Sequence, residues 1–217
     1  MRWVQNLRLV VVLLGVAAGI FGTAYAVNAM TQAPAYVKVP VTVADNEPSS
    51  GGWADVAVDL PGVTVPSGWL AGARPAGSTF GTPSPDSRLT LVAWDSTRLE
   101  QLLSRGDWLV GGLGVLAAAL VLRPVLDSIA GGRPFAPGNS RRLVALAAII
   151  AGVGAVAPLL PQVAGFLVLE RTGLAGPRFM ATPSFALTPI LVGALVLALA
   201  AAFRIGERMT DDVRGLV

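Results

Sequence analysis

Residues 143–169 read LVALAAIIAGVGAVAPLLPQVAGFLVL and contain no Asp, Glu, Lys or Arg. A bilayer hydrocarbon core of about 30 Å needs about 20 helical residues to cross it, so this stretch is long enough to span a membrane. Three further apolar runs occupy residues 7–29, 108–126 and 185–203. The sequence therefore predicts a mainly α-helical, polytopic protein with four transmembrane helices.

Composition supports the same class of protein. The 217 residues are 53% hydrophobic and only 13% charged, and the mean hydropathy of +0.66 lies outside the range of soluble globular proteins. The chain has no His and no Cys, which removes thiol nucleophiles, imidazole bases and the usual ligands of zinc and haem. We therefore expect a non-enzymatic protein without a cofactor or a metal site.

The positive charge of the chain is interpreted as a topology signal. The isoelectric point is near 10.2, but the net charge is only +3 and no basic stretch has interleaved aromatic residues, so we expect no direct binding of nucleic acid. Basic residues in short loops and flanks resist translocation. They occur in the N-terminal flank, between the second and third runs and in the C-terminal tail: Arg2, Arg8, Arg123, Arg133, Arg141, Arg142, Arg204, Arg208 and Arg214. A multi-pass cell-membrane protein with both termini in the cytoplasm is expected.

The first apolar run also has features of a cleavable signal peptide. A basic flank precedes the run, and Ala24, Tyr25 and Ala26 form a small-residue pattern of the kind found at cleavage sites. The apolar character continues to Ala29, which favours an uncleaved membrane anchor. Either outcome places the next segment outside the cytoplasm.

Residues 31–96 predict a small β-rich extracytoplasmic insertion between the first and second helices. Apolar and polar residues alternate over residues 37–43, 56–60 and 89–93, which is the period of half-buried strands. Residues 46–52 and 74–86 are rich in Pro, Gly and Ser and are expected to form turns or loops. A unit of this size without disulfides buries little core, so packing on helix ends or on a second copy would stabilise it.

Three tryptophans, Trp53, Trp69 and Trp94, fall within the insertion. They are able to line an aromatic pocket for a ligand, or to form the core of the unit or touch lipid headgroups. Core or headgroup contact is the favoured interpretation.

The insertion ends at a helix start. Thr97 followed three residues later by Glu100 matches a capping box, and Leu99, Leu102 and Leu103 follow at helical spacing. We expect one helix over residues 97–130 that continues into the second span and couples it to the insertion.

The spans are poor in ionisable groups, which disfavours proton-coupled transport. Arg123 and Asp127 lie at the cytoplasmic end of the second helix, and their spacing of four residues predicts an ion pair there. Gly15 and Gly19 allow close approach of another helix. Three prolines are expected to kink or end helices near the outer membrane face: Pro158, Pro161 and Pro189.

The predicted organisation has eight segments. They are the flank and first transmembrane helix (1–30), the insertion (31–96), the helix entering the second span (97–130), a cytoplasmic loop (131–142), the third span (143–169), an outer loop (170–184), the fourth span (185–203) and a cytoplasmic tail (204–217).

The loop and the tail carry the most distinctive sequence. The loop reads GGRPFAPGNSRRL over residues 131–143, in which Asn139 or Ser140 is expected to cap the third helix. The tail reads FRIGERMTDDVRGLV over residues 203–217. At these positions the chain resembles the bacterial four-span membrane protein family called domain of unknown function 2975, although Met209 and Arg214 depart from the family's tail pattern. The matching residues are Gly132, Pro134, Phe135, Asn139, Arg141, Arg142, Leu143, Gly206, Arg208, Asp211, Gly215, Leu216 and Val217.

The resemblance implies a membrane location and commonly a neighbouring small helix-turn-helix regulator. By analogy, the loop and tail are expected to dock such a regulator. The alternative is that Arg141 and Arg142 anchor the loop to anionic lipid headgroups. The candidate docking or anchoring residues are Arg133, Phe135, Asn139, Arg141, Arg142, Glu207, Arg208, Asp211 and Asp212. A cluster of salt bridges between the loop arginines and the tail acids is expected.

A sensory or regulatory membrane protein is the favoured function. A small transporter or pore component is the alternative, and a homo-oligomer is compatible with either. A membrane-embedded enzyme is disfavoured, because no spacing ties together a catalytic pair among Asp55, Asp59, Asp86 and Ser87.

Overall fold

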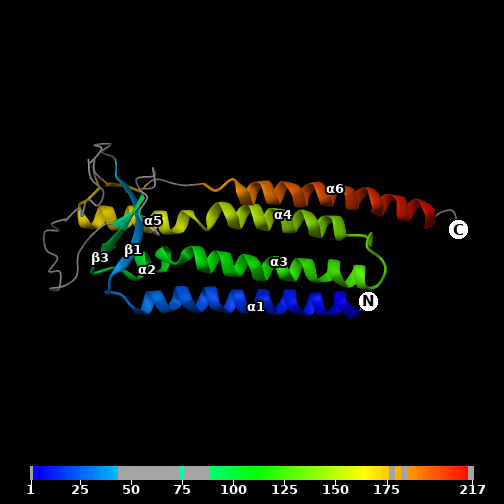
Figure 1. Cartoon of the computed structure of the whole chain (residues 1–217), viewed down its shortest axis with the longest axis horizontal. Helices are drawn as coiled ribbons and strands as arrows, with labels where there is room; N and C mark the ends of the chain where they lie inside the picture. The colour runs from blue at the N-terminus through cyan, green and yellow to red at the C-terminus, as the bar shows by residue number, and fades with distance from the viewer. Residues whose placement is uncertain (1, 44–73, 76–87, 176–178, 182–184, 215–217) are drawn as a thin grey trace. The chain divides into compact units, whose positions relative to one another are not determined.

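The structure of the chain is a computed structural model that describes residues 2–43, 74–75, 88–175, 179–181 and 185–214 (Figure 1). It is mainly helical, with four long apolar helices and a small sheet, as predicted. The elements are α1 (Arg2–Thr31), β1 (Val37–Val43), β2 (Arg74–Pro75), β3 (Arg88–Ala93), α2 (Arg98–Ser104), α3 (Gly106–Ala130), α4 (Asn139–Val156), α5 (Leu159–Thr172), β4 (Phe179–Met180) and α6 (Thr188–Arg214). The predicted strand over residues 56–60, Trp53, Trp69 and the loop over residues 46–52 lie outside the described residues.

The chain divides into two compact units. Unit 1 comprises Met1–Tyr25, Trp108–Ala157 and Phe185–Val217, and unit 2 comprises Ala26–Asp107 and Pro158–Ser184. The chain therefore passes from one unit to the other four times.

Four helical segments of the described chain are long and apolar enough to cross a membrane. They are Asn6–Thr31, Gly106–Ala130, Asn139–Thr172 and Thr188–Thr210. The four predicted apolar runs thus correspond to four helical segments, although the third one consists of two helices.

In unit 1, α1 packs closely on α3 through small residues. A Cβ added at Gly15 would lie 2.5 Å from the Cβ of Ala119, and one added at Gly19 would lie 3.0 Å from a methyl group of Leu116. These glycines let the two backbones approach closely, as their spacing of four residues predicts. In the same unit α4 and α6 lie side by side along their length (Figure 1).

Prolines divide the third apolar run into two helices. Helix α4 stops at Val156, and α5 begins at Leu159 with Pro158 as its N-cap residue. Proline has no N–H to donate and its ring clashes with the preceding turn, so a helix break here is expected. The 18 residues of α4 are about 27 Å long, close to the thickness of a bilayer core. The remaining part of the run, α5, belongs to unit 2.

The sheet of unit 2 has the strand order β2-β3-β1-β4, and neighbouring strands are antiparallel. Val37 pairs with Ala93 and Val39 with Leu91, and all four side chains are buried. The alternation predicted for residues 37–43 and 89–93 is therefore confirmed as two paired strands.

Helix α5 completes the core of this sheet. Ala164, Val168 and Leu169 are buried in the same cluster as the β1 valines and Leu91 of β3. A Cβ at Gly165 would lie 2.8 Å from the carbonyl oxygen of Pro40, so glycine permits the close approach of α5 to β1. The small insertion thus obtains its core from a segment that the sequence assigned to a membrane span.

The predicted capping box at the start of α2 is confirmed. The Thr97 hydroxyl accepts a hydrogen bond from the Glu100 N–H, and the Glu100 carboxylate accepts one from the Thr97 N–H at 2.9 Å. Glu100 is 3% exposed, and its other oxygen accepts a bond of 2.8 Å from Nε of Arg171 on α5. The buried carboxylate is therefore paired, as its burial requires.

The helix expected over residues 97–130 is divided in the structure. Arg105 forms a turn between α2 and α3, and its N–H bonds back to the carbonyl groups of Leu102 and Leu103. A C-terminal turn of this tightened kind ends a helix. Two separate helices, α2 and α3, therefore replace the single helix that was predicted.

Candidate functional site

One end of unit 1 brings together three segments that are far apart in the sequence. Arg8 near the start of α1 contacts Asp127 near the end of α3, and Ser140 at the start of α4 contacts Glu207 near the end of α6. Figure 1 shows the start of α1, the connection between α3 and α4 and the end of α6 at this same end. We call it the loop end of unit 1.

Helix α3 terminates at the loop end in a Schellman motif. Gly132 has a φ of +69°, and its N–H bonds to the carbonyl of Ile129 while the N–H of Arg133 bonds to that of Ser128. This paired arrangement satisfies carbonyl groups that a helix end leaves free, and the left-handed residue is normally glycine. Gly132 therefore turns the chain sharply into the loop.

Asn139 holds the loop from inside. Its side chain is fully buried, and Nδ2 donates to the Ser128 hydroxyl at 2.5 Å and to the Pro134 carbonyl at 2.9 Å. Its Oδ1 accepts a bond of 3.1 Å from Arg142. Asn139 is thus a structural residue of the loop, because its burial leaves no surface for a partner.

The predicted capping of α4 by Asn139 or Ser140 is wrong. The N-cap residue is Gly138, with a φ of +93°, and no side chain of this segment makes a capping bond there. A cap residue has to precede the helical turn, whereas Asn139 and Ser140 are the first two residues of the helix itself. Their side chains are consequently free for other contacts.

Glu207 on α6 caps α4 from across the groove. One carboxylate oxygen accepts a bond of 2.8 Å from the backbone N–H of Ser140, and the other accepts one of 2.9 Å from the Ser140 hydroxyl. The N–H groups in the first turn of a helix lack intrahelical partners and favour a negative charge. Glu207 therefore ties the start of α4 to α6.

Phe135 makes a second contact between the loop and α6, in addition to the bonds of Glu207. Its ring lies 5.4 Å from that of Phe203, measured between centroids. A Cβ at Gly206 would overlap the Phe135 ring, so only glycine at this position leaves room for the ring. Phe135, Phe203 and Gly206 thus form one contact between loop and helix.

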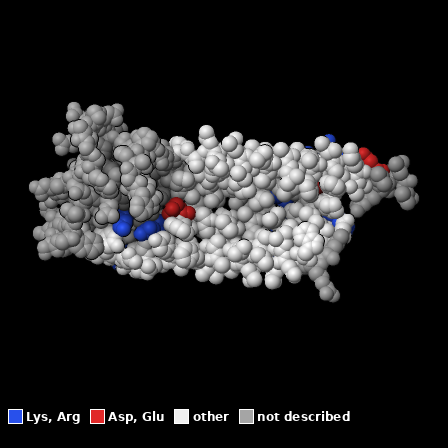
Figure 2. All heavy atoms as spheres, viewed as in Figure 1, with Lys and Arg blue, Asp and Glu red and all other residues white. Residues whose placement is uncertain are grey.

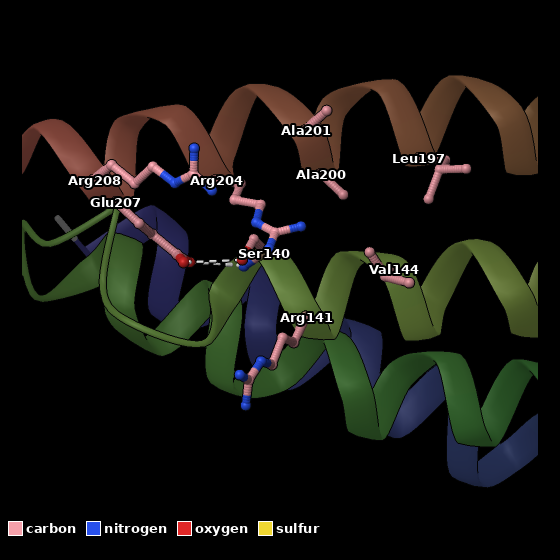
Figure 3. Close-up of a pocket in the computed structure, with 9 residues that line it drawn as sticks. All are labelled: Ser140, Arg141, Val144, Leu197, Ala200, Ala201, Arg204, Glu207 and Arg208. Carbon is pink, nitrogen blue, oxygen red and sulfur yellow. Dashed lines mark hydrogen bonds between the residues drawn. The ribbon is translucent and has the colours of Figure 1, made fainter.

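A groove of about 450 Å³ lies between α4 and α6 at the loop end (Figure 3). The α4–α6 groove is lined by Ser140, Arg141, Val144, Leu197, Ala200, Ala201, Arg204, Glu207 and Arg208. Figure 3 shows the Arg204 side chain directed from α6 toward the start of α4, while that of Arg141 points away from α6. Basic and apolar residues therefore share this groove.

The predicted pair of Arg123 and Asp127 has a stronger competitor. Arg123 Nε lies 4.0 Å from Asp127 Oδ2, at the limit of an ion pair, whereas Nη1 of Arg8 lies 2.6 Å from Asp127 Oδ1. All three side chains are more than a third exposed, so water screens both pairs. The main partner of Asp127 is consequently Arg8 on α1, and not Arg123 on its own helix.

Among the side chains that the structure describes, the loop arginines and the tail acids do not form the expected salt bridges. Among the described side chains, none of the ion pairs joins the loop to the tail, because Glu207 is bound to Ser140 and Arg142 to Asn139. Arg133, Arg141 and Asp212 are exposed. The side chain of Asp211 lies outside the described residues.

Sequence reasoning missed three residues of the loop end. From the sequence, Arg8 and Arg204 are interpreted only as positive charges that set the membrane topology, and Ser140 only as a possible helix cap. Their contacts depend on which helices are neighbours, and the sequence pattern does not specify this. Phe135, Asn139 and Glu207 are among the predicted candidates, and all three contact other residues of unit 1.

The fold and the site define the chain as a mainly helical protein with four long apolar helices, a small sheet and a basic groove between α4 and α6. A comparison with protein-family models gave no match, and comparisons with curated proteins and with solved structures gave none either. Among the described residues, no group of three or more acidic side chains is placed to hold a metal ion.

Proposed function

We propose that this chain is a non-enzymatic integral membrane protein that crosses the cell membrane four times. The observation that carries this proposal is the exposure of large apolar side chains on the long helices, such as Leu13 at 59%, Leu191 at 64% and Leu195 at 72%. In the most apolar window of each segment at most 22% of the residues are buried inside the protein. Soluble monomers rarely expose a contiguous apolar surface of this extent, and a bilayer would cover it.

The distribution of charge supports this placement. Figure 2 shows an uncharged surface over the middle of the helices of unit 1, with most charged atoms toward the helix ends. The loop end carries Arg8, Arg123, Arg133, Arg141 and Arg142, and Arg204 and Arg208 follow on α6. Short segments rich in arginine stay in the cytoplasm, so the loop end and both termini are cytoplasmic in this proposal.

We further propose a sensory or regulatory role, in which the loop end docks a small helix-turn-helix regulator. The docking part of this proposal rests on the resemblance of the loop and tail described above, which is an analogy. The exposed side chains of Arg133, Arg141, Arg208 and Asp212 are available for such a partner. Asn139 and Glu207 are occupied within the protein and contribute indirectly by fixing the loop.

Two experiments test the parts of this proposal separately. Extraction of isolated membranes with alkaline carbonate should leave the full chain in the pellet, and its release into the supernatant would contradict membrane insertion. Co-purification from gently solubilised membranes should recover a soluble DNA-binding protein, and Arg133→Ala should weaken that recovery. Arg98→Ala is the matched control, because Arg98 is an exposed arginine of unit 2. Recovery without a DNA-binding partner, combined with substrate flux in proteoliposomes, would favour a transporter instead.

A further inference from the structure

We propose that the α4–α6 groove binds the headgroup of an anionic phospholipid from the surrounding membrane. This inference rests on the proposed membrane insertion and does not depend on a docked regulator. Its basis is the combination of basic and apolar residues in a groove of about 450 Å³, which falls within the roughly 300–1,000 Å³ typical of small-molecule sites.

The charge of the groove is complementary to an anion. Three arginines belong to its lining, and of these Arg204 is directed toward the start of α4 whereas Arg141 points away from α6 (Figure 3). No described carboxylate lies within ion-pair distance of Arg204 or Arg208. The single acidic residue of the lining, Glu207, has both oxygens bound by Ser140. The positive end of the α4 dipole at Ser140 further offsets the charge of Glu207. A phosphate group would therefore meet a net positive surface.

The apolar part of the groove extends toward the hydrocarbon layer. Leu197 precedes Arg204 by seven residues on α6, which is about 10 Å along a helix. Leu197 and Ala201 lie within the apolar run of residues 185–203, which ends directly before Arg204, and both are exposed, as is Val144 on α4. The groove therefore runs from residues at acyl-chain depth to arginines at headgroup depth, which matches the two ends of a phospholipid.

This depth favours a lipid over a protein partner. A folded cytoplasmic protein would reach the arginines but not Leu197, which lies within the predicted span. Basic pockets between membrane helices on the cytoplasmic side are known sites for anionic headgroups. A lipid that joins α4 to α6 would reinforce the same contact that Glu207 makes.

Native mass spectrometry of the full chain tests this inference. The protein is reconstituted in nanodiscs of equimolar phosphatidylcholine and phosphatidylglycerol, and the lipids that remain bound after ejection are counted. We expect preferential retention of phosphatidylglycerol, lowered about fivefold by Arg204→Gln, since one arginine near an anionic headgroup contributes about 1 kcal/mol. Arg98→Gln removes the same charge from unit 2 and should leave retention unchanged.

A second variant tests the apolar half without changing charge. Ala201 is exposed in the groove, so Ala201→Phe should fill it without disturbing the core and should also lower retention of phosphatidylglycerol. Equal retention of both lipids by the unmodified chain would overturn the inference, as would an equal loss in the Arg98→Gln and Arg204→Gln variants. A dimer that Arg204→Gln dissociates, without bound lipid, would assign the groove to a second copy. Recovery of the chain in the carbonate pellet separates each of these outcomes from a failure of membrane insertion.

Discussion

The carboxylate of Glu207 on α6 receives hydrogen bonds from both the backbone N–H and the hydroxyl of Ser140 at the start of α4. A residue 67 positions away thus performs the capping that helix starts normally obtain from a neighbouring side chain. The start of α4 and the end of α6 are therefore coupled, and any event that moves one of them acts on the other through this contact.

Removal of this trans cap should destabilise the chain. Glu207→Ala deletes both bonds to Ser140 and should cost about 1–2 kcal/mol, the range for loss of a helix cap. Thermal unfolding in detergent would show a lower midpoint. Asp212→Ala is the control, because its carboxylate is exposed on the same helix and makes no described hydrogen bond or ion pair. An equal shift in both variants would contradict the capping role.

Phe135 and Gly206 should show energetic coupling in a double-mutant cycle. Alanine is favoured over glycine inside a helix by about 1 kcal/mol, but a Cβ at Gly206 displaces the Phe135 ring. Gly206→Ala should therefore stabilise the Phe135→Ala variant more than it stabilises the unmodified chain. The comparison requires four unfolding curves. If Gly206→Ala changes the free energy of unfolding equally in both backgrounds, the coupling energy between Gly206 and Phe135 is zero and the prediction is wrong.

The buried pair of Glu100 and Arg171 should be costly to break from one side. The Glu100 side chain is 4% exposed, so Arg171→Ala leaves a carboxylate with little water to replace its partner. The free energy of unfolding is expected to fall by about 2–3 kcal/mol. This is below the ~3–5 kcal/mol for a fully buried pair, because the Arg171 side chain is 28% exposed. Limited proteolysis of unit 2 measures the effect. The double variant Glu100→Gln with Arg171→Ala should be less damaged than Arg171→Ala alone.

The membership of α5 in the core of unit 2 also predicts a contrast between two of its residues. Leu169 is 2% exposed against the sheet, so Leu169→Ala should cost about 2–5 kcal/mol. Phe166 is 56% exposed on the same helix, and Phe166→Ala should change stability little. Protease resistance of the two variants distinguishes them. Similar sensitivity would mean that α5 does not pack on the sheet.

The sequence predicts local features of this protein well. The strands of residues 37–43 and 89–93, the capping box of Thr97 and Glu100 and the helix break near Pro158 follow from alternation, cap chemistry and proline geometry. These features depend on residues close together in the chain. The sequence alone therefore suffices to locate them.

Contacts between distant segments could not be predicted in the same way. An apolar helix that packs on a sheet and one that faces lipid have similar compositions, so the sequence pattern does not distinguish α5 from the rest of the third apolar run. Glu207 is predicted to pair with an arginine, yet its carboxylate accepts a hydrogen bond from the backbone N–H of Ser140 at the start of α4. Every helix start has such N–H groups whatever its sequence, so the pattern of residues does not reveal this partner. Which partner such a residue or helix contacts is determined by the tertiary packing of the helices and the sheet.

The most direct test of the central claim uses the absence of Cys from the chain, which makes single cysteines unambiguous reporters. Leu195→Cys places a thiol on a side chain that is 72% exposed in the folded chain, and Asp212→Cys places one near the C-terminus. A membrane-impermeant maleimide reacts with the thiolate in water. We predict that in intact membranes Leu195→Cys stays unlabelled on both sides, while Asp212→Cys is labelled only after the cytoplasmic face is opened. Rapid labelling of Leu195→Cys without detergent would contradict the account, because it would mean that water, and not lipid, surrounds the exposed apolar helices.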